Sequence, residues 1–209
     1  MVADLGNEAF FNKCLEYTST VAPTNTPGEF IAACGAAGLG KLVSEGKYHH
    51  YERLRHLASD IRWRVREGVA MALQYAGRKD FHTVLSHIDP WIQGNLYEQR
   101  ALVAGLCEPD LLKDKEQVKL VLERVFSILH KLSKISDRKG EPFRVLRKGL
   151  GYGISVSIVA YPEKGKPLFE NIIHNTDPDV QWIVRENLKK NRLIRMDPDW
   201  VNAMKTRLS

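Results

Sequence analysis

A tryptophan and a carboxylate occur together twice in this chain, in a basic setting that could serve nucleic-acid recognition. Trp63 precedes Glu67 by four residues, and residues four apart share one face of a helix. Trp182 stands in the same way before Glu186. Aromatic faces stack on bases, and arginine and lysine bind phosphates, so the pattern indicates a nucleic-acid-binding surface. The residues expected to form this surface are Arg62, Arg64, Arg66, Arg147, Trp182, Arg185 and Lys189.

Packing is the alternative explanation for the same side chains. In a stack of helical repeats each inner helix touches a neighbour on two sides, so Trp63 would pack between units. Arg66 and Arg185 would then pair with aspartates of adjacent units. The position of the charge separates the two explanations. A groove rich in Arg62, Arg64, Arg100, Arg147 and Lys189 favours DNA, whereas an uncharged apolar groove favours a protein partner.

Both tryptophans belong to an octet that recurs. DIRWRVRE, residues 60–67, returns as DVQWIVRE, residues 179–186, with six of eight positions alike in kind. The separation of 119 residues is about three times 40, and periods of about 20 to 50 residues are typical of solenoids. Weaker copies lie between, in NLYEQRALVAGL with Arg100 and in PFRVLRKGLGYGI with Arg147.

The octet predicts a capped amphipathic helix. Asp60 and Asp179 are expected N-caps, because a short acceptor side chain satisfies the free N–H groups of a first turn. An apolar arc follows each cap; it comprises Ile61, Val65, Val69, Ala72, Leu73 and Ala76 in the first copy, and Val180, Val184 and Leu188 in the second. Other amphipathic helices are expected ahead of the inner ones, within residues 47–58, 79–88, 114–132 and 166–175.

This pattern resembles the HEAT-repeat family, in which the second helix of each unit reads Asp, several residues, Val-Arg and a small or apolar run. The resemblance implies an all-α, HEAT-like α-solenoid of four to five antiparallel helix pairs, a right-handed superhelix with a concave inner face. Residues 1–209 would form a single repeat domain. An N-terminal capping helix (1–27) and a C-terminal one (197–209) would flank the repeats (28–196).

The chain is most similar, within that family, to the HEAT-like alkylpurine DNA glycosylases (AlkD type). They carry Trp-x-x-x-Asp on one inner helix, Gln-Arg-Ala on the next and an aromatic after Gly on a further one. Here Trp63 and Glu67, then Arg100 within Gln-Arg-Ala, then Tyr152 after Gly151 follow in that order. The sequence departs from the pattern in having Glu for Asp and Tyr for Trp.

The resemblance implies a mechanism without metal or cofactor. Trp63 and Tyr152 would hold a cationic alkylated purine, Glu67 would stabilise the oxocarbenium and position a water, and Arg100 would bind a phosphate. The leading hypothesis is thus a protein that binds duplex DNA and excises alkylated purines by hydrolysis of the N-glycosidic bond. Binding to DNA without catalysis is also open. The alternative from another class is a non-enzymatic HEAT-repeat scaffold that binds a protein on its concave face.

Composition narrows the class of protein. The formal net charge is +6 and the pI about 9.2, which favours an anionic partner such as nucleic acid. No apolar run reaches the length of a membrane span, and no signal peptide is recognised. Three widely spaced cysteines argue against a disulfide framework and a zinc cluster. They suit a reducing, cytoplasmic setting.

Three local patterns suggest other chemistry. GAAGLGKL, residues 35–42, approaches a phosphate-binding loop but ends in Leu42 where Ser or Thr would hold magnesium, so its glycines are expected to allow close helix contact. Residues 149–161 alternate like a strand, although the repeat register favours a helix. The histidines show no tight ligand pattern and are expected to be ordinary helix residues; they are His49, His50, His56, His82 and His87.

Overall fold

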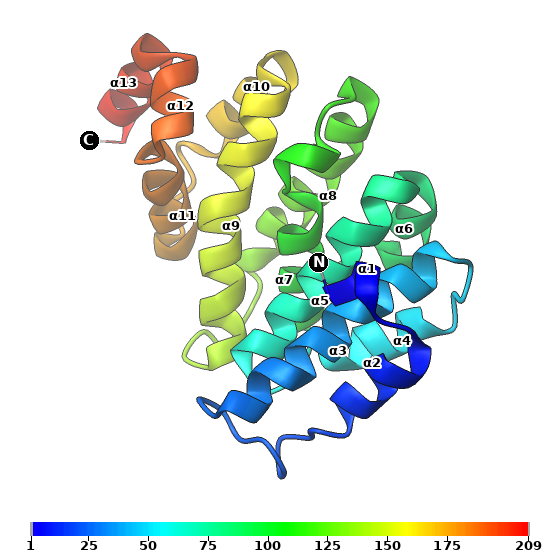
Figure 1. Cartoon of the computed structure of the whole chain (residues 1–209). Helices are drawn as coiled ribbons and strands as arrows, with labels where there is room; N and C mark the ends of the chain where they lie inside the picture. The colour runs from blue at the N-terminus through cyan, green and yellow to red at the C-terminus, as the bar shows by residue number, and fades with distance from the viewer. Residues whose placement is uncertain (1, 209) are drawn as a thin grey trace. The chain divides into compact units, whose positions relative to one another are not determined.

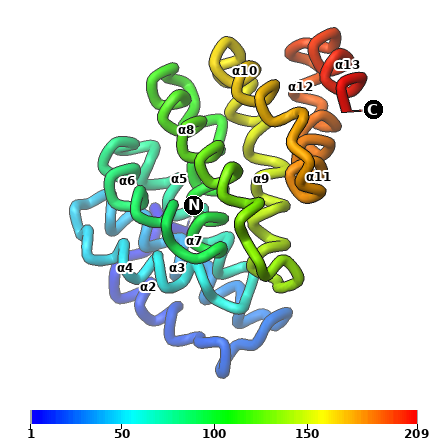
Figure 2. Tube along the Cα trace, turned by 180° about the vertical axis from the view of Figure 1, so that it is seen from behind, coloured from blue at the N-terminus to red at the C-terminus, as the bar shows by residue number. Residues whose placement is uncertain are grey.

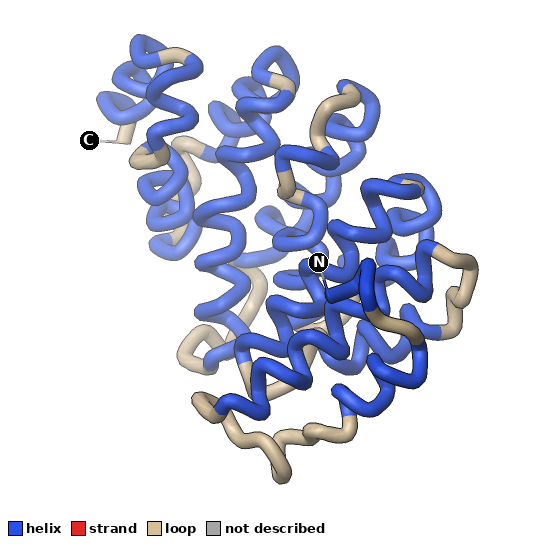
Figure 3. The backbone as a smooth tube through the Cα atoms, viewed as in Figure 1, coloured by secondary structure: helices blue, strands red, loops and turns tan. Residues whose placement is uncertain are grey.

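The computed structural model describes residues 2–208, and this part of the chain is helical with no strand (Figure 3). The all-α prediction is therefore confirmed. Residues 149–160 belong to one long helix, so the strand interpretation of that segment is wrong. Within residues 2–208, no helix is both long enough and apolar enough to cross a membrane. The three cysteines are free, and burial raises the pKa of Cys107 to about 12.

The chain divides into two compact units, Met1–Leu106 and Cys107–Ser209, here called unit 1 and unit 2. The helices of unit 1 are α1 (Val2–Leu5), α2 (Glu8–Leu15), α3 (Pro27–Ser44), α4 (His50–Leu57), α5 (Trp63–Lys79), α6 (Phe81–Ile88), η1 (Asp89–Gln93) and α7 (Leu96–Leu106). Within this unit α3 contacts α1, α2, α4 and α5, and α5 contacts α4, α6 and α7 as well (Figures 1 and 2). The two long helices α3 and α5 therefore form its centre.

Unit 2 is built around the 20-residue helix α9. Its elements are η2 (Pro109–Leu111), α8 (Lys115–Leu132), α9 (Glu141–Ala160), α10 (Pro162–Ile172), α11 (Pro178–Leu188), α12 (Asn191–Met196) and α13 (Pro198–Arg207). Helix α9 contacts α8, α10, α11 and α12 (Figure 1). The polar residues 133–140 form the loop between α8 and α9.

Glycines bring α3 and α5 into backbone contact. A Cβ atom on Gly40 would lie 2.4 Å from the carbonyl oxygen of Ala72, and one on Gly68 would lie 2.5 Å from that of Ala33. Real Cβ atoms do not approach oxygen so closely, so both positions require glycine. The apparent phosphate loop is thus the middle of α3, and the expected role of its glycines in close helix contact is confirmed.

The two octets begin their helices differently, which corrects the predicted caps. Asp60 does not cap α5. The helix begins at Trp63, and Asp60 instead accepts bonds from the backbone and guanidinium of Arg62. In the second copy the N-cap is Asp177, two residues before Asp179. Ile61 precedes its helix and is 66% exposed, so it does not belong to the buried apolar arc.

Candidate functional site

Unit 1 brings together three of the four predicted catalytic residues. Trp63 is the first residue of α5 and is 45% exposed, and Glu67 lies one turn further along. Arg100 reaches across from α7, where its guanidinium contacts the Glu67 carboxylate and donates to the carbonyl oxygen of Arg66 at 3.3 Å. The carboxylate of Glu67 is therefore held in a fixed direction by a cation from the neighbouring helix.

Trp63 and Glu67 line one pocket of about 320 Å³ between α3 and α5. Its walls are mostly apolar; they comprise Val2, Phe30, Ala33, Cys34, Ala37, Trp63, Arg64, Glu67, Gly68 and Met71. Phe30 is 62% exposed and Met71 41% exposed, so apolar surface continues around the pocket's mouth. A planar group with an apolar face and a positive charge fits this combination of an aromatic ring and a carboxylate.

The N-terminus of α5 is fixed by a carboxylate from α3. Glu29 is fully buried, and its side chain accepts the backbone N–H of Arg64 at 3.2 Å. Since Arg62 at the N-cap position makes no side-chain cap, Glu29 supplies an acceptor that the helix lacks. Arg64 lies over the Trp63 ring at 4.6 Å from its centroid. Trp63, which lines the pocket, is thus positioned by Glu29, which fixes the start of α5, and by the guanidinium of Arg64.

Arg62 and Arg66 are buried, and each residue is 3% exposed. Arg62 donates to the carbonyl oxygens of Tyr17 and Ala22 and pairs with Asp60. Arg66 donates to the carbonyl oxygens of Asp60 and Ile61. Both guanidinium groups bind backbone carbonyl oxygens near the start of α5, and little of either residue is exposed.

In unit 2 the predicted residues Arg147 and Trp182 contact each other. The Arg147 guanidinium lies 4.4 Å from the Trp182 ring centroid and pairs with Asp179 at 2.5 Å. Arg185 is exposed, unlike its counterpart Arg66 in the first octet. Lys189 is exposed and pairs with Glu186 at 2.6 Å, and that hydrogen bond lowers the pKa of Glu186. Arg185 and Lys189 are the exposed cations of this group, whereas Arg147 is half-buried.

Tyr152 lies in unit 2, where it forms an exposed aromatic–cation cluster on α9. The ring is 52% exposed, and Arg192 lies 4.3 Å from its centroid and donates to its hydroxyl at 2.7 Å. Lys190 lies 5.9 Å from the same ring. About half of the residue thus remains accessible to solvent beside these cations.

Two further cations continue this cluster along α9. Arg144, Lys148 and Tyr152 are spaced by four residues and are all exposed, so they form one stripe of the helix. Arg144 and Lys148 therefore present two positive charges to solvent one turn apart. Arg144 and Lys148 are not among the binding residues predicted from the sequence, although their four-residue spacing can be recognised there.

The net charge belongs entirely to unit 2. Residues 1–106 contain 11 Lys and Arg against 11 Asp and Glu, whereas residues 107–209 contain 20 against 14. The second unit therefore has a formal charge of +6 and the first unit has none. Attraction to a polyanion would be a property of unit 2.

Comparison of the chain with protein-family models, with curated proteins and with solved structures finds no match.

Proposed function

We propose that this chain is a DNA-binding protein of the HEAT-like α-solenoid type, with four to five antiparallel helix pairs in a right-handed superhelix. The observation that carries DNA binding is the stripe of Arg144, Lys148 and Tyr152 on a unit that holds the whole net positive charge. Exposed cations at helical spacing suit a phosphate backbone, and an exposed aromatic ring beside them suits a base. Arg185 and Lys189, from the predicted set, add to the same charge.

The proposed binding residues are tested by reversing their charge. We expect the double variant Arg144→Glu, Lys148→Glu to bind duplex DNA at least about tenfold more weakly at moderate salt. The slope of log affinity against log salt should fall by about 2, because two phosphate contacts are lost. Fluorescence anisotropy with a labelled duplex at several salt concentrations measures both quantities.

A charge-matched control distinguishes a site from a general field. Lys113→Glu, Lys119→Glu changes the charge of unit 2 by the same amount, at exposed lysines that already have acidic neighbours. This control should keep most of the affinity. Equal losses in the two double variants would show that the stripe on α9 is not a binding site, and the DNA proposal would lose its main support.

We further propose that unit 1 supplies an alkylpurine N-glycosylase site at Trp63, Glu67 and Arg100. The bond between the sugar C1′ and the base nitrogen breaks, and its electron pair leaves with the base and neutralises the cationic purine. Glu67 stabilises the positive charge that develops on the sugar and accepts a proton from the water that adds to C1′. Trp63 stacks on the base. Arg100 orients the carboxylate.

Release of free methylated purine from alkylated duplex DNA tests this activity. We expect native protein to release it, and Glu67→Gln to be slower by about 100-fold while binding the duplex equally well. Glu52→Gln, an exposed carboxamide change on α4, is the control and should act like the native chain. Absence of release by the native protein would end the enzyme proposal and leave DNA binding standing.

A protein-binding scaffold is the second candidate, because the pocket of unit 1 is largely apolar and continues into exposed Phe30 and Met71. Arg62 and Arg66 are buried and bind backbone carbonyl oxygens, so they add little positive charge to the surface of unit 1. If this candidate function holds, a protein partner that binds the native chain should not bind the double variant Phe30→Glu, Met71→Glu. The same variant would retain a partner that binds elsewhere.

A further inference from the structure

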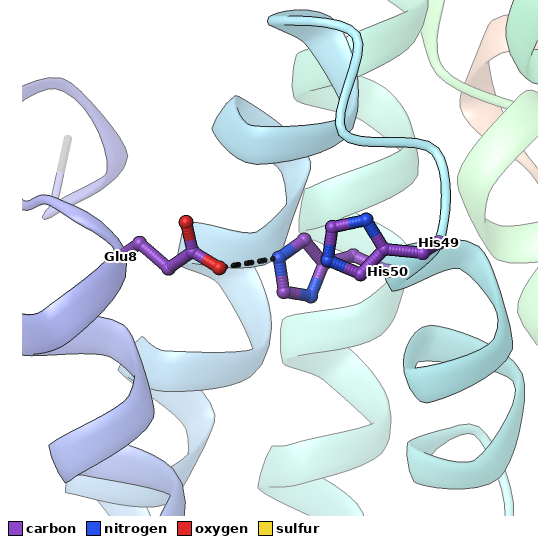
Figure 4. A group of neighbouring side chains, drawn as sticks. All are labelled: Glu8, His49 and His50. Atoms are coloured by element: carbon purple, nitrogen blue, oxygen red, sulfur yellow. Dashed lines mark hydrogen bonds and ion pairs between the residues drawn. The ribbon is translucent and has the colours of Figure 1, made fainter.

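Glu8, His49 and His50 converge at one side of unit 1 (Figure 4). Glu8 is the first residue of α2, His49 occupies the N-cap position of α4, and His50 opens that helix. One potential ligand atom from each lies within 4.8 Å of the other two. Two imidazoles and a carboxylate are a donor set that zinc and similar cations accept.

The spacing of two donors already matches a metal's coordination shell. The His50 Nε2 atom lies 3.1 Å from the Glu8 Oε1 atom. Ligand bonds of about 2.0–2.1 Å in a tetrahedral arrangement place neighbouring donor atoms about 3.3 Å apart. For a metal ion to bind between the His50 Nε2 and Glu8 Oε1 atoms, these two atoms would have to move apart by only a few tenths of an ångström. The centroids of the His49 and His50 rings lie 4.1 Å apart, so His49 can provide a third donor.

The surroundings keep these groups ready to bind a cation. His50 is buried, and its Nε2 atom faces the Oε1 atom of Glu8, so the ring is fixed in the direction of the site. Lys47 donates to the other carboxylate oxygen of Glu8 at 2.6 Å. That contact orients the carboxylate with Oε1 toward the histidines.

We propose that Glu8, His49 and His50 form a binding site for a divalent transition-metal ion, with Zn²⁺ the cation that best fits their donors. Hard cations such as Mg²⁺ prefer all-oxygen shells and do not suit two imidazoles. The exposed side of His49 leaves room for water as a fourth ligand. A bound ion would join α2 to the start of α4, segments held together here by contacts of Glu8 with Lys47 and His50.

Metal binding is tested with the full chain, free of any histidine tag and stripped of metal with a chelator. Zn²⁺ is titrated in competition with a chromogenic chelator, and Co²⁺ is used for its visible spectrum. We expect one equivalent bound and a tetrahedral Co²⁺ absorption band. Zn²⁺ at about 100 times its dissociation constant should raise the Tm by about 5 °C or more.

Three variants locate the site. His49→Ala changes an exposed side chain and should fold normally, yet weaken Zn²⁺ binding by about tenfold or more, since even loss of a residue supporting a ligand costs that much. Glu8→Gln should lose affinity and the Co²⁺ band likewise. His82→Ala, an exposed histidine of α6, should bind as the native chain does. Absence of stoichiometric binding, or native affinity in His49→Ala, would overturn the proposal.

Discussion

Replacing Gly40 by alanine is expected to lower the free energy of unfolding of unit 1 by about 4 kcal/mol. The added Cβ atom would lie 2.4 Å from the carbonyl oxygen and 2.6 Å from the Cα atom of Ala72. Because these are backbone atoms, no rotamer change relieves the overlap, and α3 must move away from α5. Alanine's better helix propensity returns only about 1 kcal/mol. Urea unfolding, with hydrogen exchange resolved for α3 and α5, measures the loss.

Gly151→Ala is the matched comparison, because it makes the same change within α9. There the new Cβ atom would lie 3.1 Å from a ring atom of Trp182 and 3.4 Å from Glu186 Cβ. Side chains can adjust where backbone cannot, so the packing cost and the propensity gain should nearly cancel, within about 1 kcal/mol. Equal effects of the two substitutions would contradict the backbone contact between α3 and α5.

The helices were predictable because apolar periodicity is a local property. Val65, Val69 and Leu73 recur at helical spacing and all lie in the core. The same reasoning assigned α9 correctly despite its glycines. Helix beginnings were less predictable. The octets look alike, but their helices begin at different positions. Helix α11 begins at Pro178, one residue before the second octet, whereas α5 begins at Trp63, the fourth residue of the first octet.

The buried arginines show why a local pattern does not predict which cations lie at the surface. Arg62 binds carbonyl oxygens of Tyr17 and Ala22, which lie 45 and 40 residues earlier in the chain. No periodicity within the octet carries that information. Sequence alone therefore presents Arg62 and Arg64 as equivalent surface cations, although the first is buried and the second is partly exposed.

The candidate site was predictable in part. Trp63 and Glu67 share a helix turn, so their spacing alone brings them together, whereas Arg100 lies 33 residues beyond Glu67 and was indicated only by resemblance. In the structure Trp63 and Glu67 line the same pocket. The stripe of Arg144, Lys148 and Tyr152 can be recognised locally from its four-residue spacing on α9. These residues lie outside both octets, so the repeat of the octet does not indicate them.

Substitution of Asn187 by leucine is expected to destabilise unit 2 by about 3 kcal/mol. Asn187 is fully buried on α11 and bridges to the backbone of α9. Its side-chain oxygen accepts the N–H of Ser155 at 2.8 Å, and its amide donates to the carbonyl oxygens of Leu150 at 3.0 Å and Ile183 at 2.8 Å. Leucine has similar volume but offers no partner to these polar groups, which stay buried.

The loss should appear as a lower urea midpoint, with faster hydrogen exchange in α9 and α11 than in α8. Asn202→Leu provides the control, because Asn202 is exposed on α13 and the change should stay within about 0.5 kcal/mol. The amide bridge also explains a feature of the sequence. Position 187 lies between the buried Val184 and Leu188, where periodicity alone would favour an apolar residue. A stable Asn187→Leu variant would show that packing alone holds α9 to α11, and that the bridge contributes nothing to the energy of the pair.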